Sequence, residues 1–512
     1  MSQLFARKSL ADCENDIAER GGLKRSLNNW HLTALGVGAT IGAGIFATTG
    51  TAIVGDSLRP GAGPAIVLSF VLTALTCGFA ALCYAEFAAM VPISGSAYTY
   101  AYASLGEIVA WIIGWDLIIE YAVGNIGVAI GWAGYFRELM SHFGVAVPAW
   151  LSTDYRSAFD AARQVAAGAT DPAVQYLASA VAAAPHLLGV PIIFNLPAFL
   201  VVALITVILV IGIKESADSN TAMVVLKIGI ILFFCAVGAT LIKPINWNNP
   251  ATGGFAPNGF AGISAGAAIV FFSYIGFDAT STAAEEAKDP AKDMPFGIIM
   301  SLVVCTVLYI VLALVMTGMA PWKQLGTPEP MITALALADG SPALLNVSRL
   351  IVSLGAVIAM SSVLLVFQLG QPRIFMSMAR DGLLPPFLSK VHPRFKTPWI
   401  GTILTGIFVG VFAAFANIAE VVDLTNIGTL FAFILVSAGV IVLRRTDPDR
   451  VRPFRAPWVP VTPIISILAC LYLMFQLPTI TWIRFLIWLV VGLVIYFSYG
   501  VRHSRYRAGH RE

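Results

Sequence analysis

Lys227, Asp116 and Glu120 are ionisable residues inside long apolar stretches of the sequence. Lys227 has apolar turns on both sides, in Val224-Val-Leu-Lys-Ile-Gly229. An ionisable residue within a membrane is costly and is by default a functional candidate. Because burial disfavours the charged ammonium group, Lys227 could bind and release a proton. The alternative is a lysine permanently paired with a carboxylate or with free carbonyls. We prefer the proton-coupling role.

Asp116 and Glu120 are four residues apart, so they share one face of a helix. The two carboxyl groups could neutralise Lys227, meet the cationic group of a ligand, or form a buried polar network that keeps helices in register. For Asp116 we expect the structural role, and for Glu120 both roles stay open. Glu86 and Glu107 lie near the ends of their apolar stretches, where we expect gating or structural roles.

Two of the apolar stretches contain residues that weaken a helix. The first is Gly36-Val-Gly-Ala-Thr-Ile-Gly-Ala-Gly-Ile-Phe46, and the second is Phe271-Phe-Ser-Tyr-Ile-Gly-Phe-Asp278, which Gly276 and Asp278 interrupt. Unwound backbone is tolerated at membrane depth only where it is buried in protein or lines a cavity. Two interrupted segments at corresponding places in two halves of a chain indicate the binding site of a transporter.

The chemistry of such a pair of breaks suits a small zwitterion. A carboxylate would accept hydrogen bonds from the free N–H groups of the first break, aided by the N-terminus of a half-helix. An ammonium group would donate to free carbonyls of both breaks, so that no charged side chain is needed. Phe272, beside Gly276, is a candidate lid over the ligand.

The composition predicts the membrane spans that would position these residues. Hydrophobic residues make up 58% of the chain and charged residues 12%, with a mean hydropathy of +0.82. About 20 apolar residues are needed to cross the hydrocarbon core. On this criterion we predict twelve spans, at residues 31–52, 64–90, 107–135, 190–212, 219–241, 262–284, 296–320, 348–369, 399–418, 426–443, 461–478 and 482–500.

The distribution of Lys and Arg predicts the orientation. With twelve spans, 22 of these residues fall on the side of the N-terminus, eight fall on the other side, and Lys227 lies within a span. The positive-inside rule then places residues 1–30 and the tail 501–512 in the cytoplasm of a cell (inner or plasma) membrane protein. Because residues 1–30 are polar, we expect no cleavable signal peptide. The Ala-rich segment 141–189 is predicted to be an external, partly helical insertion.

Several classes of protein are disfavoured by the sequence. The six cysteines show no CxxC and no His/Cys ligand spacing, so we expect neither a metal site nor a disulfide framework. No P-loop is present, so we expect no ATP-driven step within this chain and no cofactor. No nucleophile–base constellation accompanies the breaks, which argues against an enzyme. The positive charge is a topology signal, so we expect a lipid bilayer and no nucleic acid as a partner.

Together these motifs resemble the amino acid–polyamine–organocation (APC) superfamily, and within it the bacterial twelve-span form of the cationic amino acid transporter (CAT) branch. The resemblance covers about residues 22 to 500. It rests on the two interrupted segments and on Gly63-Pro-Ala, Cys83-Tyr-Ala-Glu-Phe, Ser94-Gly-Ser-Ala-Tyr98, Gly106-Glu, Trp111-Ile-Ile-Gly-Trp-Asp-Leu-Ile-Ile-Glu-Tyr121, Glu285-Glu-Ala-Lys-Asp-Pro290 and Ser377-Met-Ala-Arg-Asp-Gly-Leu-Leu-Pro385.

The resemblance implies an all-α polytopic protein with a LeuT-like fold. Residues 31–241 would form a first five-helix repeat and residues 262–443 a second, inverted one, followed by two peripheral helices within 461–500. It also implies that Lys227 is the proton-coupling lysine and that Gly276 and Asp278 have gating or structural roles. The implied substrate-binding residues are Thr40, Ile41, Gly42, Ala43, Gly44, Phe272, Ser273, Tyr274, Ile275 and Met360, with Glu120 as a further candidate.

Two departures from the family pattern are visible. The external segment 141–189 is longer than expected, and residue 273 is Ser where Ala is expected. The branch name suggests cationic substrates, yet bacterial members include broad carriers of neutral amino acids. We therefore predict proton-coupled uptake of L-amino acids, mainly small or neutral ones, by alternating access. The alternatives are an Arg/Lys uniporter or exchanger and a non-transporting amino acid sensor. A small accessory membrane protein as a partner stays an open question.

Overall fold

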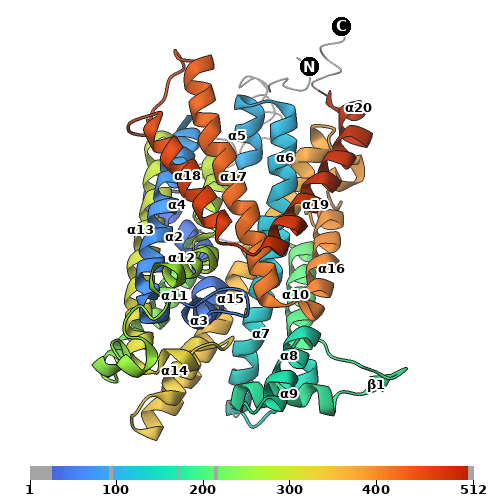
Figure 1. The fold of residues 1–512 in the computed structure, drawn as a ribbon. Helices are drawn as coiled ribbons and strands as arrows, with labels where there is room; N and C mark the ends of the chain where they lie inside the picture. The colour runs from blue at the N-terminus through green and yellow to red at the C-terminus, as the bar shows by residue number, and fades with distance from the viewer. Residues whose placement is uncertain (1–25, 91–95, 170–171, 213–216, 506–512) are drawn as a thin grey trace.

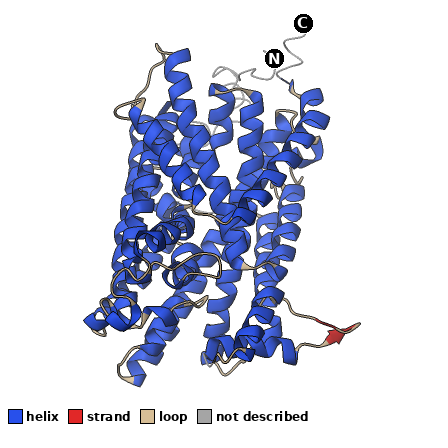
Figure 2. Ribbon diagram, in the orientation of Figure 1, coloured by secondary structure: helices blue, strands red, loops and turns tan. Residues whose placement is uncertain are grey.

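The computed structural model describes residues 26–90, 96–169, 172–212 and 217–505. Within these ranges the protein is almost entirely helical, and its one sheet is the antiparallel hairpin of β1 (His186–Leu187) and β2 (Val190–Pro191) (Figure 2). The all-α class expected from the sequence is confirmed.

The first part of the chain begins with a helix that is interrupted near its middle. The helix α2 (Asn29–Thr40) gives way to an unwound stretch, a π-helical turn and a short α-helix. The π-helical turn is η2 (Gly44–Thr48) and the short α-helix is α3 (Thr49–Val54). The elements that follow are η3 (Gly63–Ala65), α4 (Ile66–Met90), α5 (Ser96–Ser104), α6 (Glu107–Ile118), η4 (Ile119–Val123), α7 (Gly124–His142), α10 (Leu196–Ile211) and α11 (Ala217–Ala239).

The second part also begins with an interrupted helix. After α12 (Gly259–Val270) the chain forms two 3₁₀ segments, η8 (Phe271–Tyr274) and η9 (Phe277–Glu286). The remaining elements are η6 (Pro244–Asn246), η7 (Pro250–Thr252), α13 (Pro290–Met319), η10 (Trp322–Gln324), α14 (Pro330–Leu337), α15 (Pro342–Arg380), η11 (Pro386–Ser389), α16 (Trp399–Phe415), α17 (Ile418–Thr446), α18 (Val461–Phe475), α19 (Thr479–Ile495), η12 (Tyr496–Gly500) and α20 (Val501–His503).

Nine helical segments of the described chain are long and apolar enough to cross a membrane. Three of the twelve predicted spans correspond instead to the shorter apolar helices α10, α16 and α18. The protein is thus a multi-pass membrane protein. The two interrupted segments, together with Glu107–His142, are the most buried of the nine, whereas Thr479–His503 is the least buried. The interrupted helices therefore lie at the centre of the bundle.

The segment 141–189 contains η5 (Ala149–Leu151), α8 (Tyr155–Ala166), α9 (Pro172–Ala183) and β1. Small apolar side chains give it a core of its own, which includes Ala158, Ala180 and Ile193. Figure 1 shows α8, α9, β1 and α14 at one end of the bundle, and α5 and α20 at the opposite end. The partly helical insertion that the sequence predicts is therefore a small cap over one end.

Candidate functional site

The first break places the start of a new helical segment, η2, within the bundle. The helix α2 ends at Thr40, and Ile41 is extended, with φ −75° and ψ 96°. The turn η2 then starts at Gly44, after Ala43, and has no side-chain cap. The first turn of a helix has no intrahelical acceptors for its N–H groups, and this end carries a positive partial charge. These N–H groups are suited to bind an anionic group such as a carboxylate.

The second break depends on a glycine. Ile275 is extended with ψ 130° after η8, and Gly276 then has φ +120°. This left-handed conformation favours glycine. A Cβ atom at Gly276 would also lie only 2.8 Å from the carbonyl carbon and oxygen of Ala39. Gly276 therefore lets the second break approach the end of α2 backbone to backbone.

The two breaks meet at Gly44 and Ser273. A Cβ atom on Gly44 would lie 2.3 Å from the Cα atom of Ser273, so the backbones of η2 and η8 are in direct contact. The structure thus brings the two groups of predicted substrate-binding residues together, and all of them are buried. Their role as substrate contacts stays a prediction. These residues are Thr40, Ile41, Gly42, Ala43 and Gly44 from the first break, and Phe272, Ser273, Tyr274 and Ile275 from the second.

Phe272 and Met360 both lie against glycines of α7. A Cβ atom on Gly127 would lie 3.3 Å from Cζ of Phe272, and one on Gly131 would lie 3.6 Å from Sδ of Met360. The same Cβ on Gly131 would lie 3.2 Å from Cβ of Ala43, in the first break. The predicted lid and the predicted pocket floor therefore contact the same helix, beside the breaks.

Lys227 is completely buried in α11 and reaches the end of the first half-helix. Its Nζ atom donates to the carbonyl oxygen of Gly38 at 2.5 Å. Because the last carbonyls of a helix lack intrahelical donors and carry negative partial charge, a cation is stabilised there. The hydroxyl of Tyr309 donates to the neighbouring carbonyl of Thr40 at 3.2 Å. Lys227 thus holds the C-terminal end of α2 directly before the break.

Asp116 and Glu120 do not neutralise Lys227, contrary to one of the alternatives that the sequence left open. None of the ion pairs formed by the described residues involves Asp116, Glu120 or Lys227. Glu120 instead faces Asp278 of the second break, from η4. One Asp116 oxygen lies 3.0 Å from where a Cβ of Gly428 would be, so it packs closely against α17.

Glu86 and Glu107 are structural anchors at the end of the bundle that carries α20. Glu86 accepts hydrogen bonds from Arg444 at 2.7 and 2.9 Å and from the backbone N–H of Ala456 at 2.8 Å. Glu107 accepts from the hydroxyl of Tyr102 at 3.0 Å and from that of Tyr496 at 2.9 Å. These contacts join α4 to the segment after α17, and α6 to η12. The gating or structural roles expected for both carboxylates stay a prediction.

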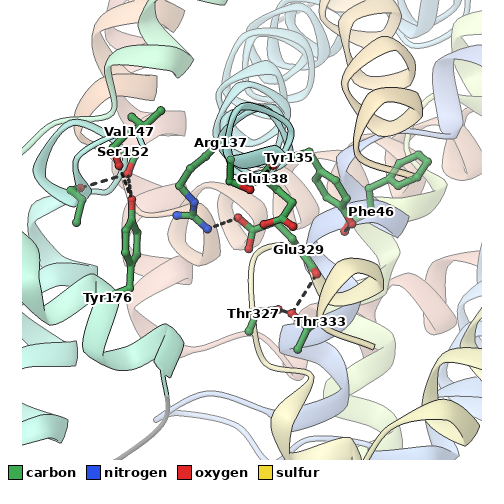
Figure 3. A network of polar contacts seen from close by, with 12 residues as sticks. Phe46, Tyr135, Arg137, Glu138, Val147, Ser152, Tyr176, Thr327, Glu329 and Thr333 are labelled. Atoms are coloured by element: carbon green, nitrogen blue, oxygen red, sulfur yellow. Dashed lines mark hydrogen bonds and ion pairs between the residues drawn. The ribbon is translucent and has the colours of Figure 1, made fainter. Parts of the chain in front are cut away.

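A polar network at the opposite end of the bundle was not expected from the sequence (Figure 3). Arg137 of α7 lies between two partners: Glu329, whose carboxylate is 2.5 Å away, and the ring of Tyr176, whose centroid is 4.8 Å away. Arg349 pairs with Glu138 at 2.5 Å. Burial raises the pKa of Glu329 and Arg137 opposes this rise. No motif marks Glu329, because it precedes the short helix α14 in a loop of ordinary composition.

This network touches the first break. The hydroxyl of Tyr135 donates to the carbonyl oxygen of Phe46, in η2, at 2.7 Å. The hydroxyl of Tyr176 donates to the carbonyl oxygen of Val147 at 3.0 Å, so the cap segment is held against the same region (Figure 3). Within the described part of the chain, no group of three or more His, Cys, Asp or Glu side chains could hold a metal ion.

Comparison with known proteins matches this architecture to one family. The sequence profile described as amino acid permease matches residues 27–497. The chain belongs to the amino acid permease family. This finding confirms the resemblance to the APC superfamily, and it identifies the chain as a transport protein rather than an enzyme.

Three relatives show the range of substrates within this family. The branched-chain amino acid permease BcaP of Bacillus subtilis is 45% identical, over 98% of each chain. The methylthioribose transporter of the same organism is 44% identical, over 98% of this chain and 99% of its own. A vacuolar cationic amino acid transporter of Arabidopsis thaliana is 36% identical, over 84% of this chain and 65% of its own.

Proposed function

We propose that this permease carries small or neutral L-amino acids into the cell together with protons, by alternating access. The single observation that carries the proposal is the contact of buried Lys227 with the Gly38 carbonyl, directly before the first break. A protonated lysine caps this half-helix, and a neutral amine caps it more weakly. The protonation state of Lys227 therefore biases the shape of the break, where the substrate's carboxylate would bind.

We also propose the twelve-span, LeuT-like arrangement of two inverted repeats. The helix pairing supports it, because α4 packs on α13, α7 on α15, and α10 on α16. Each pair joins a helix of the first repeat to its counterpart in the second. The short helices α10, α16 and α18 would complete the twelve spans, which need not all be perpendicular to the membrane or equally long. With this topology both termini are cytoplasmic and the cap over α8 and α9 is external.

The neutral substrate class is supported by the breaks themselves. Their free N–H and C=O groups complement the carboxylate and ammonium of any L-amino acid, while Phe272 and Met360 offer apolar contact. Two relatives of nearly equal identity are named for branched-chain amino acids and for methylthioribose, and neither kind of molecule has a cationic side group. We place neutral substrates ahead of cationic ones for this reason.

A cationic amino acid carrier is the second candidate function. Glu120 and Asp278 are buried carboxyl groups at the second break, and Asp116 is buried one turn before Glu120. The described residues offer no ion-pair partner to any of the three within 4.0 Å. A guanidinium or ammonium side chain of the substrate would be such a partner. The vacuolar relative named for cationic amino acids fits this candidate.

Uptake into proteoliposomes tests both candidates. We expect an inward proton gradient to stimulate uptake of labelled alanine, with leucine as a strong competitor and arginine and methylthioribose as weak ones. In Glu120→Ala, a neutral carrier keeps alanine uptake, whereas a cationic carrier loses arginine uptake. Uptake of arginine alone, indifferent to the gradient, would contradict the proposal. Substrate binding without any flux would support the sensor instead.

A further inference from the structure

Two buried carboxyl groups face each other across the second break. Glu120 lies in the π-helical turn η4 and is 3% exposed, and Asp278 lies in the first turn of η9 and is 0% exposed. Their carboxyl groups are within reach of a hydrogen bond. Both oxygens of Asp278 and Oε2 of Glu120 lack a hydrogen bond of normal geometry with any described residue, although backbone N–H groups at the start of η9 lie close to the Asp278 carboxyl. Two ionised carboxylates cannot form a hydrogen bond with each other, because neither has a hydrogen atom to donate. A hydrogen bond between Glu120 and Asp278 therefore requires a proton on one of them.

The surroundings of the pair supply no positive side chain. None of the ion pairs formed by described residues includes Glu120 or Asp278. The titratable groups that face the pair are neutral phenols and a thiol, apart from Asp116 one turn earlier on the same helix. They come from two helices and are Tyr84 and Cys77 of α4 and Tyr100 of α5.

Two adjacent ionised carboxylates in such surroundings are strongly unfavourable. Burial without a partner disfavours a charge, and a like charge beside it adds repulsion. A single proton removes both penalties, because it neutralises one carboxyl and makes the contact a hydrogen bond. Asp278 is the better site for the remaining negative charge, since it lies at the N-terminal, positive end of η9. Glu120 is then the proton donor.

An independent observation also points to this place. The Thr429 hydroxyl of α17 is fully buried, is directed at Glu120, and makes no hydrogen bond of normal geometry with a described residue. This hydroxyl can donate to an oxygen of Glu120 in either protonation state. The buried hydroxyl of Tyr84 is likewise unpartnered and faces both carboxyl groups. Unpartnered buried hydroxyls from α17 and α4 therefore lie beside the pair and can serve its oxygens.

We propose that Glu120 and Asp278 hold one proton between them, as a second proton site in addition to Lys227. On release, the O–H bond of Glu120 breaks, the proton leaves to water, and two carboxylates remain that repel each other. This repulsion acts on η9 directly beyond Gly276, which packs on Ala39 and Thr40 of the first break. Lys227 and the carboxyl pair thus act on neighbouring residues at the C-terminal end of α2, namely Gly38 for Lys227 and Ala39 and Thr40 for the pair. The coupling role of the pair rests on the proposed function, whereas the site itself does not.

Infrared difference spectroscopy of the purified full-length protein in lipid nanodiscs tests the site without any transport. We expect a protonated-carboxyl stretching band that shifts in heavy water and disappears as the pH is raised. Glu120→Gln and Asp278→Asn should each abolish this titrating band, because the proton needs both groups. Asp423→Asn is the matched control, since Asp423 is a buried carboxylate paired with Arg59 at 2.8 Å, and it should leave the band unchanged.

The outcomes separate this proposal from the transport proposal. A band that persists unchanged in both Glu120→Gln and Asp278→Asn, or that is lost only in Asp116→Asn, overturns the shared proton. Both substitutions preserve shape, and a thermal melt of each variant checks that it folds. If the band behaves as expected but wild-type liposomes show no gradient-stimulated uptake, the proton site stands and the proposed coupling fails. If uptake is stimulated and no band titrates, proton-coupled transport stands and the shared proton site fails.

Discussion

At the residue scale, the proposed binding site depends on how closely two unwound backbones approach each other. Gly44 and Ser273 touch because Gly44 lacks a side chain. Glycine is common where backbones come close together. The π-helical form of η2 starts at this contact. Irregular backbone of this kind would be costly in lipid, and here it is buried between helices.

Gly44→Ala should therefore abolish substrate binding. Its methyl group would lie 2.3 Å from the Cα atom of Ser273, and a backbone atom cannot move aside as a flexible side chain does. We expect at least a tenfold loss of uptake, equivalent to about 1.4 kcal/mol or more in binding. Gly229→Ala is the control, because a Cβ atom there meets nothing within 4 Å. Equal uptake by both variants would show that the breaks are not packed as described.

The sequence predicted which residues form the breaks and that Lys227 is buried, but it did not predict which atoms these residues contact. The glycines of the breaks and the burial of Lys227 follow from composition alone, because a lysine between apolar turns has no route to water. The acceptor of Lys227, the Gly38 carbonyl, and the pairing of Glu120 with Asp278 depend on packing between distant helices. Single-sequence periodicity carries no information on such packing.

At the element scale, Arg137 joins three elements at the end of the bundle that carries α8 and α9 (Figure 3). Its guanidinium contacts Glu329 before α14 and the ring of Tyr176 in α9. The side chain of Glu329 is only 8% exposed, so its charge depends on this partner. Burial raises the pKa of Glu329, and the Arg137 charge is what opposes the rise. Loss of Arg137 should therefore raise this pKa further.

Arg137→Met should destabilise the protein more at alkaline than at acidic pH. A carboxyl whose pKa is raised on folding retains its proton at pH values where the unfolded chain releases it, so stability falls as the pH rises towards the folded-state pKa. An unpaired buried carboxylate costs on the order of 3 kcal/mol. Thermal melts in detergent at about pH 5 and about pH 8, which both lie above the ordinary carboxyl pKa, measure the difference.

The double variant Arg137→Met/Glu329→Gln is the control for this experiment. The amide that replaces the carboxyl group of Glu329 would carry no charge, so the pH-dependent part of the loss should vanish. Lys292→Gln should change little at either pH, because its pair with Asp289 is exposed and such pairs contribute little. An equal loss at both pH values for Arg137→Met would contradict the assignment of the effect to Glu329.

At the scale of the whole molecule, charge and helix pairing agree on one arrangement. The excess of Lys and Arg on the side of the N-terminus is an insertion signal. The pairing of α4 with α13 and of α7 with α15 is what two repeats related by a pseudo-twofold axis produce. In this arrangement the cap formed by α8 and α9 faces outwards.

Labelling of single introduced cysteines tests this topology. Arg163, Lys323 and Arg394 are exposed, and the five described native cysteines are buried. In intact cells with Cys13 replaced by Ser, a membrane-impermeant maleimide should label Arg163→Cys and Lys323→Cys but not Arg394→Cys. Opposite sides for positions 163 and 323 would mean that an additional span lies between them, and would contradict twelve spans with cytoplasmic termini.

The sequence predicted the nine long apolar helices of the described chain, and it also predicted spans at three places where the helices are shorter. Long apolar runs give the spans, because a bilayer demands a fixed length of apolar helix. Their ends were less accurate, since α15 extends from Pro342 to Arg380, well beyond its apolar part. The form of the second break was also not predicted, because the 3₁₀ geometry of η9 reflects packing against α2 and α13 rather than local residue preference.

We propose that the proton on Lys227 couples the gradient to uptake, and a variant without this ammonium group tests the coupling. Alanine uptake into proteoliposomes would be compared, with and without an inward proton gradient, for wild type, Lys227→Met and the exposed control Lys292→Met. We expect the gradient to stimulate wild type and Lys292→Met, and Lys227→Met to lose both the stimulation and the pH dependence. If the gradient fully stimulates alanine uptake by Lys227→Met, the proposed coupling is wrong, and Lys227 is then only a structural cap of α2.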